Sequence, residues 1–368
     1  MRKIHDKCLI VLFCGFIFIM GILLAFLPKA KTSVYEKRAL ASFPKFSVNS
    51  VLNGKYETKL EDYINDHFPM RNGFTAVNSY YMLFSGRNGV SGIYKGKDGY
   101  LINTPIEEDR DNYTINSNAI ADFAKNTGLP STIMIIPSTG FIMEDKLPKN
   151  HEEYKDGEMI DDIRSILESD IRWVDVKAQF QADKSSGQLY YKTDHHYTTY
   201  GAFCAYRAFC GEHGFEPKTD YNVESYDGFY GTAYSKSALW YESGETFEVW
   251  RYPNNISVEI DDKVYPSMWF DEHLSEPDKY PVFLNGNQPF ERIVNPDSDG
   301  GRLLLVKDSF AHAMVPFLIN HYSCIDMVDL RYYTNPVSEL VKENMYDEAL
   351  FIYGADTFCT GKDIAILQ

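Results

Sequence analysis

Two short clusters of polar residues carry the side chains that could do chemistry in this chain of 368 residues. One is Ser309, which follows Asp308 and precedes an apolar run, and the other is the tripeptide Asp194-His195-His196. A serine hydroxyl becomes a nucleophile when a base takes its proton, and a carboxylate is needed to orient that base. His196 and Asp194 can supply both groups from one loop. The sequence therefore predicts acyl transfer through a serine ester.

Each cluster also has a simpler interpretation. Ser309 stands where a helix would begin, and its hydroxyl would serve there as a plain helix cap. The Asp-His-His tripeptide offers ligands for a metal ion, although a further ligand would have to come from Asp271, His273 or His213. Polar capping of the next helix would also explain the tripeptide. The residues alone leave these alternatives open, and we predict neither a metal nor an organic cofactor.

The elements that must position Ser309 are clearest near the C-terminus. Apolar strand-like runs alternate there with segments of helical spacing. Because such alternation produces a parallel sheet covered by helices on both faces, the predicted fold class is α/β. Ligands of these sheets bind at the carboxyl ends of the strands, where Ser309 would lie. The predicted strands are residues 302–306, 324–330 and 349–353, and the predicted helices are residues 310–320 and 337–346.

Further upstream, residues 132–137 predict a buried strand and residues 198–213 a helix that begins just after the tripeptide. Residues 220–300 differ, because they are aromatic, rich in Gly, Pro and Asp, and without long periodicity. We predict a loop-rich insertion with short strands for them. The aromatic side chains of residues 221–269 could stack on sugar rings or could simply fill the core.

The N-terminus predicts a membrane anchor. Arg2, Lys3 and Lys7 precede an uncharged apolar stretch at residues 8–27, and about 20 such residues at ~1.5 Å each span a bilayer core. A cleaved signal peptide is the alternative, and both interpretations export the rest of the chain. The expected organisation is a transmembrane anchor at residues 1–28, a stalk or docking segment at 29–70 and an α/β domain at 71–368. We expect a single-pass protein of the cell membrane whose catalytic domain lies outside the cytoplasm.

Composition excludes some partners. The formal net charge of −16 argues against a nucleic-acid partner, which requires a basic surface, and against binding to anionic lipid by charge alone. Four cysteines lie outside the apolar stretch, and their spacing fits neither a zinc ribbon nor a disulfide scaffold. Buried free thiols are the expected state of Cys204, Cys210, Cys324 and Cys359.

Several short motifs, taken in order, resemble the DHHW family of bacterial cell-envelope proteins, which are related to the alginate O-acetylation proteins AlgJ and AlgX. The resemblance implies an SGNH-hydrolase-like, flavodoxin-like sheet. The motifs are Glu36-Lys-Arg-Ala-Leu-Ala-Ser-Phe-Pro44, Tyr63-Ile-Asn-Asp-His-Phe-Pro69, Gly96-Lys-Asp-Gly-Tyr-Leu101, Thr193-Asp-His-His-Tyr-Thr198, Phe229-Tyr-Gly-Thr232, Asn285-Gly-Asn-Gln-Pro289, Lys307-Asp-Ser309 and Asp329-Leu-Arg331.

The resemblance implies that Ser309 is the nucleophile and that Asp194 and His196 complete the triad, with His195 as a neighbour of the base. It implies oxyanion donors at the Ser309 N–H, Gly231 and Asn287. Substrate contacts are expected from His195, Tyr197 and Arg331. Two positions depart from the family pattern: Tyr197 replaces a tryptophan, and Lys307-Asp308-Ser309 lacks the glycine of a Gly-Asp-Ser block.

The predicted function is O-acetylation or deacetylation of a cell-envelope or secreted polysaccharide through an acetyl-serine intermediate. Attack by a sugar hydroxyl would make the protein a transferase, and attack by water would make it an esterase. The resemblance favours transfer, with acetyl groups supplied by a multi-pass membrane acyltransferase as partner. The alternative is a catalytically silent carbohydrate-binding or assembly protein of the cell envelope.

Overall fold

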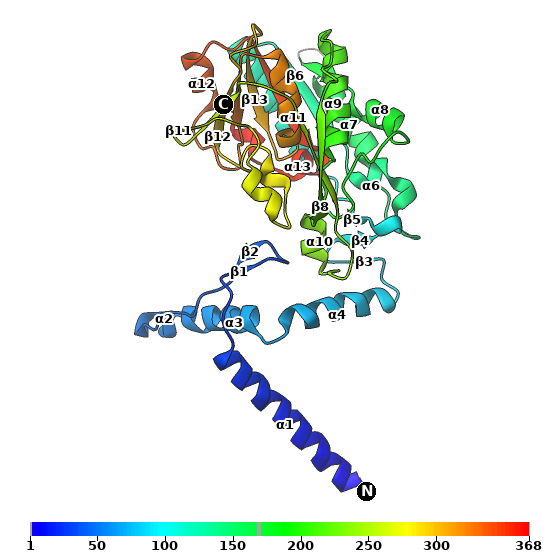
Figure 1. Ribbon diagram of the computed structural model, residues 1–368, viewed down its shortest axis with the longest axis vertical. Helices are drawn as coiled ribbons and strands as arrows, with labels where there is room; N and C mark the ends of the chain where they lie inside the picture. Colours follow the sequence, from blue (N-terminus) through cyan, green and yellow to red (C-terminus); the bar gives the residue numbers. More distant parts are fainter. Residues whose placement is uncertain (1, 168–170, 368) are drawn as a thin grey trace. The chain divides into compact units, whose positions relative to one another are not determined.

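A computed structural model describes residues 2–167 and 171–367 (Figure 1). The chain forms two compact units. The first consists of Met1–Ser91 with Tyr234–Glu242, and the second consists of Gly92–Ala233 with Ser243–Gln368.

The first unit begins with the long apolar helix α1 (Arg2–Phe26). Its 21-residue stretch Asp6–Phe26 has a mean hydropathy of 3.0, and none of its most apolar window is buried. This length and composition suit a membrane-spanning helix, and a signal sequence has the same properties. The elements that follow are β1 (Thr32–Ser33), β2 (Arg38–Ala39), α2 (Val48–Leu52), α3 (Lys55–His67), α4 (Arg71–Phe84) and β3 (Gly89–Val90).

The second unit is built on an eight-stranded sheet with the strand order β11-β10-β12-β14-β13-β15-β6-β7. The strands from β14 to β7 pair in parallel, whereas β12, β10 and β11 add an antiparallel edge. The α/β fold class is therefore confirmed. The strands are β6 (Ser131–Ile136), β7 (Arg172–Val174), β10 (Ser257–Ile260), β11 (Lys263–Tyr265), β12 (Phe290–Val294), β13 (Arg302–Lys307), β14 (Cys324–Val328) and β15 (Glu348–Gly354).

Helices cover both faces of this sheet (Figure 1). One apolar cluster joins one sheet face to α8, α9 and α11, and a second cluster joins the other face to α5, α7, α12 and α13. Successive side chains of β13 point to opposite clusters, because Leu303 and Leu305 belong to the first and Leu304 and Val306 to the second. The helices are α5 (Arg110–Thr127), α7 (Asp156–Leu167), α8 (Val176–Asp183), α9 (Thr199–His213), α11 (Ala311–Leu318), α12 (Val337–Glu343) and α13 (Ala355–Thr360).

Smaller elements complete the description of the chain. The short helix α6 (Thr139–Ile142) belongs to the second unit, and α10 (Thr232–Ser237) runs across the boundary at Ala233. Strands β4 (Ile93–Lys95) and β5 (Leu101–Asn103) form an antiparallel pair. The remaining elements are single turns of 3-10 helix at Lys97–Gly99, Glu144–Lys146, Asp271–Ser275, Tyr280–Val282, Ile319–His321 and Ile364–Ile366.

The segment at residues 220–300 consists of loops and mostly short strands. It contains a separate antiparallel ribbon, β8 (Asn222–Phe229) with β9 (Glu245–Arg251). Its later strands β10, β11 and β12, however, extend the main sheet, where β12 pairs with β14 from Phe290↔Val328 to Val294↔Cys324. Alternate side chains of β10 and β12 are buried, the pattern of an antiparallel strand with one face on the core. Most aromatic side chains of the segment lie in the core, including Phe229, Phe247 and Trp269.

Candidate active site

Ser309 lies at the carboxyl end of β13, two residues before α11. The preceding Asp308 fixes this turn, since its Oδ1 accepts from the Phe310 N–H at 2.9 Å and its Oδ2 from the Gly354 N–H at 2.8 Å. Gly354 ends the neighbouring strand β15. Asp308 is buried, and burial raises the pKa of its carboxyl. These two hydrogen bonds hold the turn at Ser309, although the glycine of the family pattern is absent.

His196 and Asp194 complete a hydrogen-bonded chain to Ser309. His196 Nε2 lies 2.7 Å from Ser309 Oγ, and its Nδ1 lies 2.5 Å from Asp194 Oδ1. Asp194 and His196 are both buried, at 2% and 6% exposure, so water competes little for the bond between them. This is the connectivity of a serine–histidine–carboxylate triad: nucleophile, base and orienting group in series.

The Asp194 carboxylate is fixed by two backbone donors. Its Oδ1 also accepts from the His196 N–H at 2.9 Å, and its Oδ2 accepts from the Thr232 N–H at 2.6 Å. Donors aimed at a carboxylate favour its charged form. The orienting group is therefore held in one position and accepts on both oxygens.

Tyr280 is a site residue that the sequence did not point to. Its ring stacks on the His196 imidazole with centroids 4.1 Å apart and planes at 13°. Its hydroxyl donates to the Ser309 carbonyl oxygen at 3.0 Å. Tyr280 is buried, and burial raises the pKa of its phenol well above the usual value, so the hydroxyl stays a donor. Tyr280 lies in the loop-rich segment and outside every motif, so the local sequence gives no signal that points to it.

Glu245 is a second residue that sequence reasoning missed. It begins β9, and its carboxylate accepts from the N–H groups of Lys192 and Thr193 at 2.8 and 2.7 Å and from Thr193 Oγ1 at 2.7 Å. It thereby ties the start of the loop that carries Asp194 and His196 to the β8–β9 ribbon. Burial raises the pKa of this carboxyl.

Gly231 has a different role from the expected one. Its N–H donates to Thr193 Oγ1 at 3.1 Å, so this amide is engaged with the loop and the expected oxyanion role is not supported. A Cβ at this position would lie 2.2 Å from Asp194 Cβ and 2.5 Å from the Thr193 carbonyl oxygen. Glycine is required here because the chain packs directly against the triad carboxylate.

Tyr197 is also corrected by the structure. It was expected to contact substrate, but its side chain is completely buried and its hydroxyl donates to the Phe310 carbonyl oxygen at 2.5 Å. It therefore anchors the residue after Ser309 from inside the core. His195, by contrast, is 34% exposed in its side chain, with Nδ1 2.7 Å from Thr232 Oγ1.

The expected residues Asn287 and Arg331 lie beside a buried charged network. Arg331 donates through Nε to Asp329 Oδ1 at 2.8 Å and through Nη2 to Asn287 Oδ1 at 3.3 Å. Lys307 lies 3.1 Å from Asp329 Oδ2 and 2.6 Å from His312 Nε2. Burial lowers the pKa of both Lys307 and His312, and His312 accepts from the lysine as a neutral imidazole. The oxyanion and substrate roles expected of Asn287 and Arg331 stay predictions.

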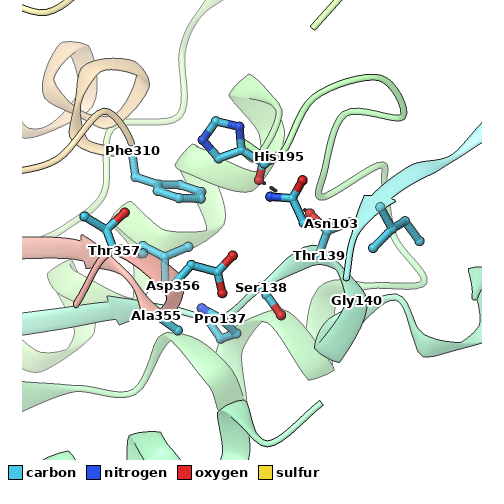
Figure 2. Close-up of a pocket in the computed structure, with 13 residues that line it drawn as sticks. Asn103, Pro137, Ser138, Thr139, Gly140, His195, Phe310, Ala355, Asp356 and Thr357 are labelled. Atoms are coloured by element: carbon cyan, nitrogen blue, oxygen red, sulfur yellow. Dashed lines mark hydrogen bonds between the residues drawn. The ribbon is translucent and has the colours of Figure 1, made fainter. Parts of the chain in front are cut away.

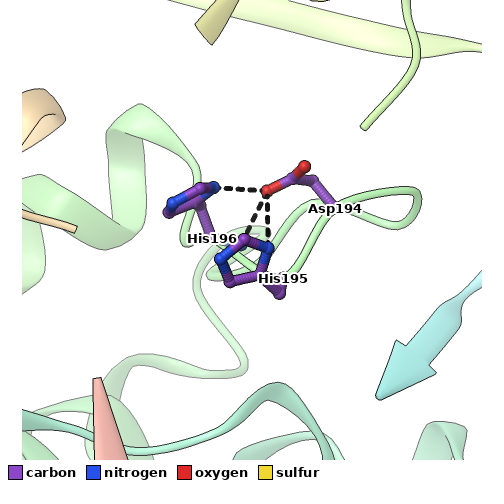
Figure 3. A group of neighbouring side chains, drawn as sticks. All are labelled: Asp194, His195 and His196. Carbon is purple, nitrogen blue, oxygen red and sulfur yellow. Dashed lines mark hydrogen bonds and ion pairs between the residues drawn. The ribbon is translucent and has the colours of Figure 1, made fainter. Parts of the chain in front are cut away.

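The metal alternative fits the site poorly. Ligand atoms of Asp194, His195 and His196 lie within 4.8 Å of one another (Figure 3). However, Asp194 Oδ1 and both His196 nitrogens are already engaged in the hydrogen bonds of the triad. The further ligands considered lie elsewhere: His213 pairs with Glu348, His273 bonds Asn285 and Asp271 pairs with Arg251.

A small hollow of about 30 Å³ lies next to the triad at the carboxyl edge of the sheet (Figure 2). His195 and Phe310 line one side of it, and residues of β5 and of the ends of β6 and β15 and the turns after them line the rest. Phe310 also meets His196 edge-on with ring centroids 5.1 Å apart, so this ring contacts both the hollow and the imidazole. The polar lining residues include Asn103, Ser138, Thr139, Asp356 and Thr357.

Comparison with known proteins agrees with this fold. The chain is 23% identical over 206 residues to a Pseudomonas syringae pv. tomato protein named "Probable alginate O-acetylase AlgJ", a match that covers 52% of this chain and 48% of the relative. It thus spans about half the length of that relative. Among solved structures, a DHHW family protein from Eubacterium siraeum has a TM-score of 0.66 at 22% identity, covering 75% of this chain and 95% of that one.

Bacillus cereus PatB1, solved with a sulfonyl adduct, has a TM-score of 0.64 at 20% identity and covers 75% of this chain and 98% of that one. These similarities show a shared fold. The sequence profile of the DHHW protein family matches residues 36–116 and 107–328. Because this match extends over well more than half of the sequence, the chain belongs to the DHHW family.

Proposed function

We propose that the protein is an extracytoplasmic serine acyltransferase that O-acetylates a cell-envelope or secreted polysaccharide. The observation that carries the proposal is the hydrogen-bonded series Ser309–His196–Asp194, with 2.7 and 2.5 Å between successive groups. The names of the relatives support the acyl group and the acceptor class, since one is called an alginate O-acetylase. The apolar helix α1, with Arg2, Lys3 and Lys7 at its start, supports export with the N-terminus inside.

In the first step, His196 Nε2 takes the Ser309 proton while Oγ forms a bond to the acetyl carbonyl carbon of the donor. The tetrahedral intermediate collapses when the donor C–O bond breaks and the imidazolium returns its proton to the leaving oxygen. In the second step His196 takes the proton of a sugar hydroxyl while that oxygen bonds to the acetyl carbonyl carbon, the ester bond to Ser309 Oγ breaks, and the imidazolium returns its proton to Oγ. Asp194 stays ionised and stabilises the imidazolium in both steps.

The developing oxyanion needs donors near Ser309. No hydrogen bond within residues 2–167 and 171–367 uses the Ser309 N–H, which precedes the N-terminus of α11. This amide is the first donor we assign, because a helix start adds partial positive charge. Asn287 is the second, since Arg331 bonds its amide oxygen and leaves the NH2 group to donate.

A groove on the second unit provides a place for the acceptor glycan. It has a volume of about 300 Å³ and is lined by the partly exposed rings of Tyr200 and Trp250 and by the polar groups of Gln188, Thr246 and Glu248. Aromatic rings stack on sugar faces while amides and carboxylates bond hydroxyls. Thr198, two residues beyond His196, also lines it, so the groove and the triad share one loop.

The test is incubation of the full chain in detergent with an activated acetyl ester, followed by intact-mass analysis. An added acetyl group that maps to Ser309 and is lost in Ser309→Ala is the expected result. Ser185→Ala, at an exposed serine of the same unit, is the matched control and should acetylate normally. Subsequent transfer to added oligosaccharide, rather than release as acetate, separates a transferase from an esterase. No adduct on the wild type would contradict the enzymatic proposal and favour a silent glycan-binding protein.

A further inference from the structure

Helix α4 of the first unit exposes a continuous apolar stripe. Met70, which caps the helix, and four residues within it follow one another at spacings of four, three, four and three, which places them on one helical face. Charged side chains are absent from the stripe. Its members and their exposed fractions are Met70 at 70%, Phe74 at 47%, Val77 at 59%, Tyr81 at 67% and Phe84 at 91%.

The other side of α4 is already packed. Ala76 and Ser79 are buried at 2% exposure each. Tyr80 stacks on Tyr241 with centroids 5.3 Å apart, and its hydroxyl bonds Glu242 at 3.3 Å. The stripe is therefore not the side by which α4 joins its own unit. An exposed apolar face of this extent indicates a partner outside the unit.

The same unit exposes further large apolar side chains before α3. Phe46 is 71% exposed, Val48 is 66% exposed and Leu52, at the end of α2, is 82% exposed. The segment as a whole follows directly on the apolar helix α1, which ends at Phe26. Interfacial segments next to a membrane helix have this composition, with aromatic rings and long apolar side chains facing the lipid.

Charge favours the same partner. Residues 29–91 carry nine lysines and arginines against five aspartates and glutamates, whereas the whole chain has a net charge of −16. The acidic excess thus belongs to the second unit. A basic segment attached to an acidic domain is attracted to anionic lipid headgroups, at short range because salt screens the interaction.

We propose that α4 lies in the headgroup region of the membrane that holds α1, with the stripe from Met70 to Phe84 turned toward the acyl chains. The surface adds a second attachment beside the spanning helix. It keeps the start of the acidic domain near the lipid, where a membrane-bound acyl donor would present its group. This inference concerns the first unit and does not depend on the chemistry proposed for Ser309.

Site-directed spin labelling of the full chain in proteoliposomes tests the proposal. Cys8 and Cys14 are exposed in α1 and are replaced by alanine, while the other four cysteines are buried. A label is attached at Tyr81→Cys or Phe84→Cys on the stripe, and at Asn72→Cys, an exposed position on the opposite side of α4, as the control. Collision rates are measured with lipid-soluble oxygen and with a water-soluble nickel chelate.

The expected result is an oxygen-to-nickel collision ratio several-fold higher at positions 81 and 84 than at 72. This ratio should rise further when phosphatidylglycerol is added to phosphatidylcholine vesicles. Equal, water-like ratios at all three positions would overturn the proposal. Labels shielded from both reagents would also overturn it, because they would show a protein partner, and dipolar broadening would identify that partner as a second copy of the chain.

Discussion

The phenol ring of Tyr280 lies nearly parallel to the imidazole of His196, 4.1 Å away, while its hydroxyl donates to the carbonyl oxygen of Ser309. One buried side chain thus contacts both His196 and Ser309. We predict that Tyr280→Phe, which keeps the ring and removes the hydroxyl, lowers the rate of Ser309 acetylation by a few-fold to about tenfold, because one hydrogen bond is worth ~1 kcal/mol. Stopped-flow measurement with an activated ester gives the rate. Tyr226→Phe, whose hydroxyl bonds Glu224 on the ribbon, is the control and should be unaffected.

Asp194→Asn should abolish most of the activity while the protein stays folded. Asparagine has one acceptor oxygen and one donor NH2 group, so it cannot accept from both His196 Nδ1–H and the Thr232 N–H. The imidazole then loses its orientation, and its Nε2 no longer accepts from Ser309. Loss of the orienting carboxylate in a triad costs about 10⁴-fold in turnover. Steady-state ester hydrolysis measures this, with circular dichroism as the check on folding. A variant that keeps a tenth of the wild-type rate would show that Asp194 does not orient the base.

Gly231→Ala should reduce both activity and stability. The added methyl group would stand 2.2 Å from Asp194 Cβ, so either the carboxylate or the Thr232 backbone must move. The matched control is Gly211→Ala in α9, where nothing lies within 4 Å of the new Cβ. There alanine should raise the free energy of unfolding by ~0.5–1 kcal/mol. Thermal unfolding of both variants checks the contrast, and equal melting temperatures would contradict the close packing described at Gly231.

Trp250→Ala in the groove should separate the two half-reactions. The ring lies outside the triad, so acetylation of Ser309 should proceed normally, whereas transfer to an oligosaccharide acceptor should fall by about tenfold if one stacking contact is lost. Glu248→Gln should have a smaller effect in the same direction. The two rates are measured by intact mass and by acetylated-sugar formation. Unchanged transfer in Trp250→Ala would remove the groove from the acceptor site.

The buried Glu291 should make stability depend on pH. Neither of its carboxylate oxygens has a hydrogen-bond partner among the described residues, and burial raises its pKa from 4.5 to about 8. A raised pKa means that the folded state binds the proton more tightly than the unfolded state. The stabilisation is thus complete below pH 4.5 and is lost progressively as the pH rises to about 8. Melting temperatures across this range should fall less steeply for Glu291→Gln than for the wild type, and parallel curves would contradict the prediction.

The parts of this structure that local sequence could predict are those with regular spacing. Periodicity predicts the apolar strands β13, β14 and β15 and the helices between them. The residue types also predict a cap for α9, where the Thr198 hydroxyl accepts from the Gly201 N–H. The association of Asp194, His196 and Ser309 was expected from their residue types and from the family resemblance. Parallel strands that end at one edge then bring such residues together.

The residues that sequence reasoning missed act over long separations. Tyr280 is far from both His196 and Ser309 along the chain, and Glu245 is 52 residues from Thr193. Such contacts leave no periodic trace, because packing and not spacing decides them. The strands β10 and β12 are four and five residues long, too short for their alternation to stand out among loops. Gly231 illustrates a further limit, since a motif glycine does not reveal whether its N–H or its missing side chain is required.

Two carboxylates, Asp308 and Glu245, hold Ser309 and the loop of His196 to different strands of the fold. Asp308 bonds the turn of Ser309 to β15, and Glu245 of β9 bonds the loop that carries His196. The 2.7 Å hydrogen bond between His196 and Ser309 therefore depends on two carboxylates that bond to different strands. Loss of either carboxylate would misalign His196 and Ser309 while leaving the other support intact. A defect in acylation need not, therefore, arise from Ser309, His196 or Asp194 themselves.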